Sequence, residues 1–207
     1  TGLIIFTAMH VHHTSPNFLH WLYEENDMRR KFAEISTRLH RHGTKCVSQL
    51  FHYGVQGSSA SHHDMEPLWG FSGLPSLEGE ASHRMTSDEI EEVIEAFVKT
   101  AVVAVESGMD GVELHGTHGY LIQQSFSPWG NQRQDKWGEP LYFATTLAKR
   151  VRAAIGADKV LGFRISVDDF VRPEDGGLGP EKLRGVAAKL IGLGCFMQVA
   201  TLAILYA

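Results

Sequence analysis

Two histidines and a tyrosine with close spacing are the residues of this sequence best suited to chemistry. His115 ends the short apolar segment 110–115, and His118 and Tyr120 follow it within five residues. Two imidazoles and a phenol offer hydrogen-bond donors and acceptors that can titrate. We treat these three residues as candidate site residues. The alternative is a pair of strand-end histidines that only caps a loop.

The elements around these residues predict where they lie. An apolar-periodic helix is expected from a capping box at Thr86-Ser-Asp-Glu89 to just before Gly108, and a short buried strand over 110–115 follows it. A helix, a glycine and a buried strand form a β/α repeat. In a parallel α/β barrel the carboxyl ends of the strands form the active-site face, so this is where we place the three residues.

Gln49 and Arg164 are two further polar residues in apolar, strand-like segments. Gln49 lies near the end of 44–51, and Arg164 lies inside 159–166. A charge inside a strand is costly unless it is paired, so Arg164 has either a ligand or a core carboxylate such as Glu113 as its partner. Gln49 is either functional or a polar residue tolerated at a strand end.

The whole chain follows the same repeat. Helices are expected over 27–42, 144–155 and 180–193 in addition to the one before Gly108. The predicted fold is an α/β barrel of the (β/α)8 TIM type with about five of its eight units, in one domain over 1–207. Residues 55–84 form a long loop excursion within it. The five expected strands cover residues 2–7, 44–51, 110–115, 159–166 and 196–200.

Two segments follow each other in the chain: His115-Gly-Thr-His118-Gly-Tyr120 and Asn131-Gln-Arg133-Gln-Asp135-Lys-Trp137-Gly138. Together they resemble the Old Yellow Enzyme family, the FMN barrels that include NADH:flavin oxidoreductases, 2,4-dienoyl-CoA reductases and trimethylamine dehydrogenase. Gln49-Leu50-Phe51-His52 is similar to a third family segment, although Tyr53-Gly54-Val55 departs from the Gly-Arg pair that usually follows. The connection after Gly138 is about four residues shorter than in the family.

The resemblance implies FMN as cofactor, NAD(P)H as reductant and a small-molecule substrate. Gln49 would contact the pyrimidine edge of the flavin, and Arg164 would lie near its N1 and C2 oxygen region. The enzyme would be an ene-reductase that passes hydride through the flavin to an enone or enoyl thioester. His115 and His118 would hold the carbonyl oxygen of the substrate, and Tyr120 would protonate its α-carbon.

Two other functions stay open. The same barrel in the trimethylamine dehydrogenase branch oxidises N-methyl amines, and several aromatic or imidazole side chains could line a cage for a methylated ammonium. The second alternative is a barrel fragment without catalysis. The candidate cage residues are His10, His12, His13, Trp21, Tyr53 and Trp129.

The resemblance covers only the middle of the family's catalytic domain, from its second to its sixth strand. We expect the flavin phosphate loops, which follow the last strands of such barrels, to be missing. The sheet would have two open edges, to be completed by a second copy or by the remainder of a longer polypeptide. On this basis we expect the chain alone to bind FMN poorly.

Composition excludes several classes. The net charge of −5 argues against nucleic-acid binding, and no apolar run reaches the ~20 residues that span a bilayer. The apolar start lacks the flanks of a signal peptide. Cys46 and Cys195 are expected as buried thiols in a reducing compartment, so we expect a cytoplasmic protein. The pairs His12-His13 and His62-His63 lack a metal-ligand spacing, so we expect no metal.

Overall fold

The computed structural model describes residues 1–15, 25–58, 66–75, 79–169 and 171–200, and one parallel sheet organises them. The strands lie in the order β1-β2-β5-β6-β7, and every neighbouring pair is parallel. This order confirms the five expected β/α units. The strands are β1 (Leu3–His10), β2 (Lys45–Phe51), β5 (Gly111–Gly116), β6 (Val160–Ser166) and β7 (Phe196–Ala200).

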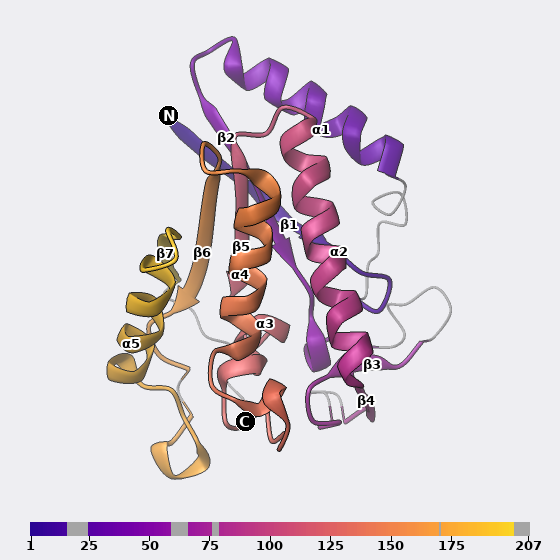
Figure 1. Cartoon of the computed structure of the whole chain (residues 1–207), viewed down its shortest axis with the longest axis vertical. Helices are drawn as coiled ribbons and strands as arrows, with labels where there is room; N and C mark the ends of the chain where they lie inside the picture. The colour runs from indigo at the N-terminus through magenta and orange to yellow at the C-terminus, as the bar shows by residue number, and fades with distance from the viewer. Residues whose placement is uncertain (16–24, 59–65, 76–78, 170, 201–207) are drawn as a thin grey trace.

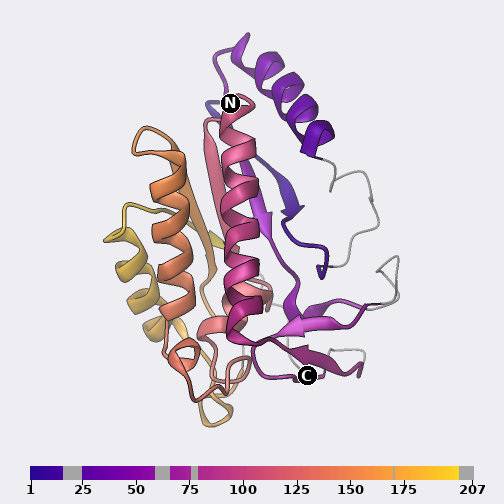
Figure 2. The same cartoon turned by 45° about the vertical axis from the view of Figure 1, so that its right-hand side comes forward.

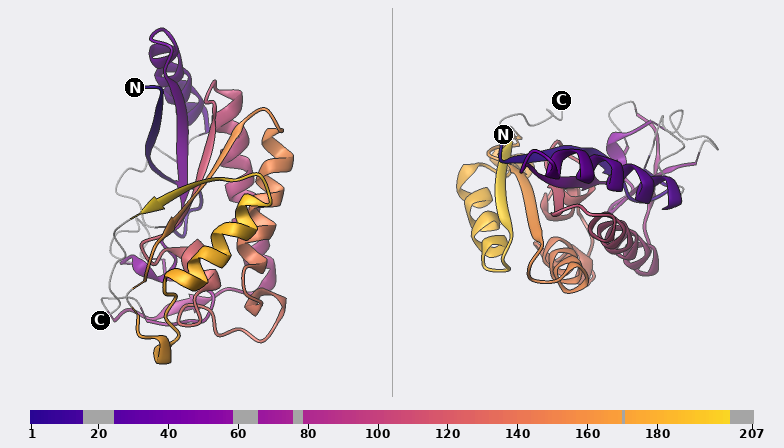
Figure 3. Two further views of the ribbon diagram at one scale, coloured as in Figure 1. Left: turned by 90° about the vertical axis from the view of Figure 1, so that its left-hand side faces the viewer. Right: turned by 90° about the horizontal axis from the view of Figure 1, so that it is seen from above.

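Helices connect consecutive strands and cover one face of the sheet (Figures 1 and 2). The sheet curls, so that the helices lie outside the arc and its other face is concave (Figure 3). This is the arrangement of a sector of a (β/α)8 barrel. The helices are α1 (Glu25–His40), α2 (Ser87–Glu106), α3 (Leu121–Phe126), α4 (Tyr142–Ile155) and α5 (Pro180–Ile191).

The hydrophobic core lies between the sheet and the helices. Side chains alternate along a strand, so one set of residues packs on the helices while the next set faces the concave side. On β5, Val112 and Leu114 belong to the core, and on β6 Leu161 and Phe163 do the same. The α2 helix adds Ile90, Val93, Ile94 and Phe97, all fully buried.

The ends of α2 confirm the expected boundary signals. The Thr86 hydroxyl accepts a hydrogen bond from the Glu89 backbone at 3.2 Å, and the Glu89 carboxylate accepts one from the Thr86 backbone at 2.6 Å. Together they form a capping box, which satisfies two backbone donors that the helix itself leaves unpaired. At the other end Gly108 has φ +96°, a conformation that suits glycine.

The excursion between β2 and α2 contains structure that the sequence did not reveal. It includes a 3-10 turn (Gly54–Gln56) and two short parallel strands, β3 (Leu68–Gly70) and β4 (Ser82–Arg84). Leu68 and Phe71 are fully buried. These strands are short and partly polar, so the sequence shows no clear alternation of apolar and polar residues that would predict a strand.

Some boundaries differ from the prediction. The β1 strand runs to His10, beyond the predicted end at residue 7, because pairing with β2 continues after an irregularity between Phe6 and Met9. The α1 helix begins at Glu25 and ends at His40, two residues earlier than predicted at each end. Leu141, at the start of α4, has φ 68°, so the short connection after Gly138 enters this helix through a left-handed residue.

Several predictions concern residues that the structure does not describe. Trp21 and residues 201–207 lie outside the described residues, as do His62-His63 and part of the excursion at 59–65 and 76–78. Among the described residues, no helix is both long and apolar enough to cross a bilayer.

Candidate active site

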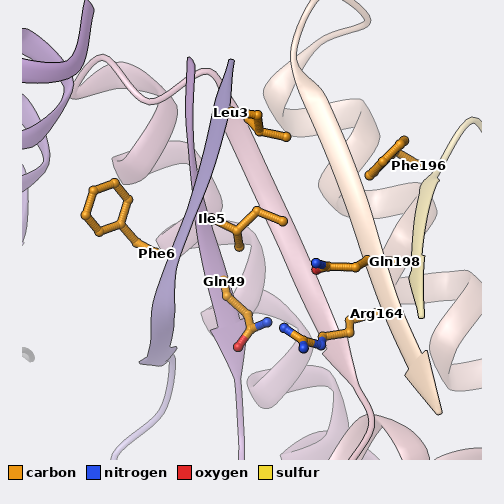
Figure 4. A pocket seen from close by; sticks show the side chains of 7 residues that line it. All are labelled: Leu3, Ile5, Phe6, Gln49, Arg164, Phe196 and Gln198. Carbon is orange, nitrogen blue, oxygen red and sulfur yellow. The ribbon is translucent and has the colours of Figure 1, made fainter. Parts of the chain in front are cut away.

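A cavity of about 560 Å³ opens on the concave face of the sheet. Apolar side chains line the part near the amino ends of the strands, and polar side chains line the part toward their carboxyl ends (Figure 4). The tips of Gln49 and Arg164 point toward each other across it. The lining residues are Leu3, Ile5, Phe6, Gln49, Arg164, Phe196 and Gln198.

A buried carboxylate holds the Gln49 amide. Gln49 and Glu113 are register partners on β2 and β5, and Gln49 Nε2 donates to Glu113 Oε1 at 2.6 Å. Glu113 is fully buried, and Gly162 beside it on β6 leaves room for its side chain, because a Cβ there would lie 3.2 Å from Glu113 Cβ and Cγ. The bond fixes which way the amide faces, so Gln49 Oε1 is left for another donor.

Glu113 also joins a third strand to this network. With its amide nitrogen facing Glu113, Gln198 on β7 donates to Glu113 Oε2 at 2.5 Å and to Oε1 at 3.2 Å. Burial raises the pKa of Glu113, while the Gln49 hydrogen bond and the charge of Arg164 act in the opposite direction. The carboxylate therefore links β2, β5 and β7 behind the cavity.

Arg164 supplies the positive charge of the cavity. It is the register partner of His115 on one side and of Gln198 on the other. Its Nε is buried without a hydrogen-bond partner among the described residues. The charge of Arg164 acts on Glu113 and lowers the pKa of that carboxyl group, so whether a ligand or this core carboxylate is the functional partner of Arg164 stays a prediction.

His115 and His118 lie side by side at the end of β5. His115 Nε2 and His118 Nδ1 are 3.0 Å apart and share a hydrogen bond, whose direction depends on the tautomers. His118 has a left-handed backbone, with φ 61°, which is uncommon for a residue other than glycine. His115 is 4% exposed, and its Nδ1 is buried without a partner among the described residues. A ligand oxygen that bonds to His115 Nε2 and His118 Nδ1 would replace the hydrogen bond between the two rings.

Burial keeps both imidazoles neutral. Burial, together with the neighbouring His118 and the charge of Arg164, lowers the pKa of His115 to about 3. Burial and the charge of Arg164 also lower the pKa of His118. Neutral imidazoles can each donate one hydrogen bond and accept one, so the pair can hold an oxygen without carrying a net charge.

Tyr120 belongs to a group of aromatic rings above the cavity. Its ring centroid lies 5.3 Å from that of His115, 5.5 Å from Phe51 and 4.9 Å from Tyr53. Burial and the neighbouring Tyr53 raise the pKa of Tyr120 to about 12. Tyr120 is therefore a protonated phenol at neutral pH, next to the two histidines.

The loop that carries His118 is fixed by glutamine side chains of α3. The Gly119 backbone donates to Gln123 Oε1 at 2.7 Å, and Gln124 Nε2 donates to the Gly119 carbonyl at 2.6 Å. Thr117, directly after β5, and Ser166, the last residue of β6, share a hydrogen bond of 2.5 Å. These contacts hold the two histidines and Tyr120 in place from behind.

The second family-like segment has a structural part in this arrangement. Arg133 is 8% exposed and forms an ion pair with Asp135, and its guanidinium also donates to the Met85 carbonyl at 2.5 Å. Asn131 Nδ2 donates to the carbonyls of Ser125 and Trp137 at 2.8 and 2.7 Å. The segment thus ties the excursion before α2 to the loop after α3.

The structure places the predicted site residues in two neighbouring groups. Gln49 and Arg164 lie in the cavity, and His115, His118 and Tyr120 lie next to it at the carboxyl end of β5. The register pair of His115 and Arg164 joins the groups. The sequence alone did not reveal Gln198 or the contact between Gln49 and Glu113. Period-two alternation indicates which residues of a strand share a face, but the register that pairs Gln49 with Glu113 comes from the fold.

The predicted amine cage divides into two separate sets. His10 lies with its ring centroid 5.3 Å from that of Tyr53, close to the aromatic group of Tyr120. His12 and His13 instead pack on Trp69 of β3, at 5.2 and 6.0 Å.

Two curated relatives are similar to this chain in sequence, and one solved structure is similar to it in fold. An N,N-dimethylglycine/sarcosine dehydrogenase of Chromohalobacter salexigens is 36% identical over 166 residues, which are 76% of this chain and 23% of the relative. An NADH:acrylate oxidoreductase of Vibrio harveyi is 33% identical over 151 residues, 68% of this chain and 15% of the relative. The solved structure of morphinone reductase has the same fold, with a TM-score of 0.80 at 20% identity over 95% of this chain and 58% of that one.

This chain thus spans well under two thirds of the length of these proteins. Residues 1–201 match a family described as NADH:flavin oxidoreductase / NADH oxidase. The match includes all five strands of the sheet and every residue of the candidate site. The chain therefore belongs to the NADH:flavin oxidoreductase / NADH oxidase family, as the resemblance of its histidine and asparagine segments predicted.

Proposed function

We propose that this chain forms part of an FMN-dependent oxidoreductase that takes hydride from NAD(P)H and delivers it, through the flavin, to an activated alkene. One observation carries the proposal. The neutral pair His115 and His118 lies beside the protonated phenol of Tyr120, next to a cavity that Gln49 and Arg164 line. Family membership supports FMN and NAD(P)H as the cofactors.

The cavity residues fit the polar edge of a flavin ring. Among the residues that the structure describes, Arg164 Nε is buried without a hydrogen-bond partner, and Gln49 presents Oε1 because its Nε2 is bound to Glu113. A guanidinium and an amide oxygen match a ring edge that carries carbonyl oxygens and an N–H group. FMN, when bound, supplies the hydride chemistry. Gln49 and Arg164 would bind and orient its ring, and Arg164 would favour negative charge there.

The residues at the end of β5 fit an oxygen-bearing substrate. His115 and His118 would hold its carbonyl oxygen with N–H donors, which stabilise the charge that develops on this oxygen as hydride reaches the β-carbon. Tyr120 would then give its proton to the α-carbon. A phenol with a pKa of about 12 is a weak acid, so this transfer depends on the carbanion character of its acceptor. The name of the acrylate-reducing relative supports an alkene of this class.

A rapid-mixing experiment tests the proposal. Protein kept saturated with excess FMN is reduced anaerobically with NADH or NADPH and then mixed with an enone, while the flavin absorbance is followed. We expect reduction by the nicotinamide and reoxidation by the enone. A flavin that the nicotinamide reduces but that no enone or enoyl thioester reoxidises contradicts the assignment of an alkene substrate.

A second candidate is the oxidation of N-methyl amines. The dimethylglycine and sarcosine dehydrogenase relative favours it, as does the pair of His10 and Tyr53 near the site. Rings in this position could contact a methylated ammonium through cation–π interactions. In the same apparatus, reduction of the oxidised flavin by sarcosine without NAD(P)H would identify this activity.

A further inference from the structure

A cluster of metal-binding residues lies outside the candidate active site, between the loop after β1 and the first half of α2. His12, His13 and Glu92 each offer one ligand atom, and these atoms lie within 4.8 Å of one another. The α2 helix starts close to β3 and β4, so the cluster borders the excursion (Figure 1). The sequence concealed it, because Glu92 follows His12 by 80 residues.

The geometry of two of these residues suits a tetrahedral ion. His12 Nε2 and Glu92 Oε1 are 3.2 Å apart. Zinc binds nitrogen and oxygen at about 2.0–2.1 Å, so two of its tetrahedral ligands lie roughly 3.3 Å from each other. The two atoms can therefore take one ion between them with very small movements.

His12 has the outer contact that a metal-binding histidine usually has. Its ring is 6% exposed, and its Nδ1 lies 2.8 Å from the Thr14 hydroxyl, which is itself 3.0 Å from His52 Nε2. The Thr14 backbone also donates to Nδ1 at 3.4 Å, so these contacts hold the ring and direct Nε2, and metal binding would require Nε2 to be deprotonated. His12 Nε2 is thus aimed at Glu92 by a buried chain of contacts.

The other ligands can adjust to an ion. His13 and Glu92 are both 56% exposed, so their side chains can rotate without disturbing the core. Trp69 packs against both imidazoles and limits their range. Glu66 Oε2, 2.9 Å from His13 Nδ1, brings a second carboxylate to the cluster.

We propose that His12, His13 and Glu92 bind a divalent transition-metal ion of the zinc class, with water or Glu66 in the fourth position. Two imidazoles and a carboxylate are a donor set that such ions accept. The ion would join the loop after β1 to α2. This loop also carries Ser15, whose hydroxyl lies 3.0 Å from His10 Nδ1 and accepts from the Tyr53 backbone at 3.1 Å. Metal binding would therefore stabilise the edge of the candidate site without taking part in hydride transfer.

Titration of the purified chain with Co²⁺ and Zn²⁺ tests this proposal. Cobalt bound in tetrahedral geometry has characteristic visible absorption, and it quenches the fluorescence of a nearby tryptophan such as Trp69. We expect one equivalent of Co²⁺ to give this absorption, Zn²⁺ to displace it, and the melting temperature to rise with either ion.

Three variants locate the ion. Glu92→Gln changes only an exposed side chain and should weaken Co²⁺ binding at least tenfold without loss of folding, and His12→Ala should do the same if circular dichroism shows it folded. His40→Ala is the matched control, because His40, Cys46 and Asp110 form the other cluster of potential ligands among the described residues. Binding that is unchanged in Glu92→Gln, or that is lost in His40→Ala instead, would overturn the proposal.

Discussion

Glu113 Oε1 accepts a hydrogen bond of 2.6 Å from Gln49 Nε2, across the register pair that joins β2 to β5. A buried carboxylate thereby sets the direction of an amide that lines the candidate flavin cavity. Because the amide nitrogen is engaged, its carbonyl oxygen is the atom presented to a ligand. Glu113 is therefore a positioning residue for Gln49, and the titration of its carboxyl group can be measured.

The stability of the protein should fall as the pH rises through the titration of Glu113. Burial raises its folded pKa above the unfolded value of 4.5, so the folded state binds the proton more tightly. The contribution of Glu113 is therefore fully present below pH 4.5 and is lost as the pH rises through the folded pKa. Glu113→Gln, which cannot titrate, should gain stability relative to the wild type as the pH rises above 4.5. Urea unfolding curves whose difference does not change with pH contradict this.

Replacing Arg164 with Ala should raise the pKa of His118. The charge of Arg164 contributes to the lowered pKa of this imidazole, after burial. NMR titration of the histidine ring signals measures the effect, and Arg164→Lys serves as the control that keeps the charge. In flavin-loaded protein the same Ala variant should lower the flavin potential. If neither the pKa nor the potential moves, Arg164 is a structural residue.

Removal of the Tyr120 hydroxyl should affect one half of the reaction only. Tyr120→Phe should slow reoxidation of the flavin by an enone by about 10²- to 10⁴-fold, the usual effect of losing a general acid. Flavin reduction by NAD(P)H should keep its wild-type rate, because no proton from Tyr120 is needed there. Rapid-mixing measurements of each half-reaction separate the two. Equal loss in both would point to a structural role for the ring.

Much of this arrangement was predictable from the sequence because local signals agreed. The capping box at Thr86, the glycine at 108 and the apolar strand before His115 all predicted the same β/α unit. Once that strand was placed, the spacing of His118 and Tyr120 put them at its carboxyl end. Parallel strands also bring their carboxyl ends together, which brought Gln49 and Arg164 into one cavity.

What could not be predicted depends on contacts between distant segments. The partner of Gln49 is 64 residues away, and its identity follows from the register of two strands, which the sequence of neither strand fixes. The polar excursion forms β3 and β4 because Arg133 and the core hold it, and the strands themselves have little periodicity. The contact between His12 and Glu92 also joins distant segments, so the local sequence around neither residue predicts it.

The chain on its own should bind the flavin ring without gaining from the phosphate. Arg164 is the one cationic side chain that lines the described cavity, and we assign it to the ring. FMN and lumiflavin, which lacks the phosphate, should therefore bind with similar and weak affinity in equilibrium dialysis. Sedimentation should show self-association, because β1 and β7 are sheet edges among the described strands. Tight stoichiometric FMN on a monodisperse monomer contradicts both expectations.

The assignment of His115 and His118 to the substrate oxygen is the central claim. Protein kept saturated with excess FMN is titrated with a para-substituted phenol, whose oxygen resembles that of an enolate, and the long-wavelength charge-transfer absorption is recorded. Because the pKa of His115 is about 3, its charge should not alter binding between pH 5 and 9. We predict a charge-transfer band in the wild type. We also predict that His115→Ala and His118→Ala, with flavin retained, bind the phenol roughly 10- to 150-fold more weakly, as expected for a lost hydrogen bond to a charged oxygen. Unchanged phenol titrations in both variants would contradict the account.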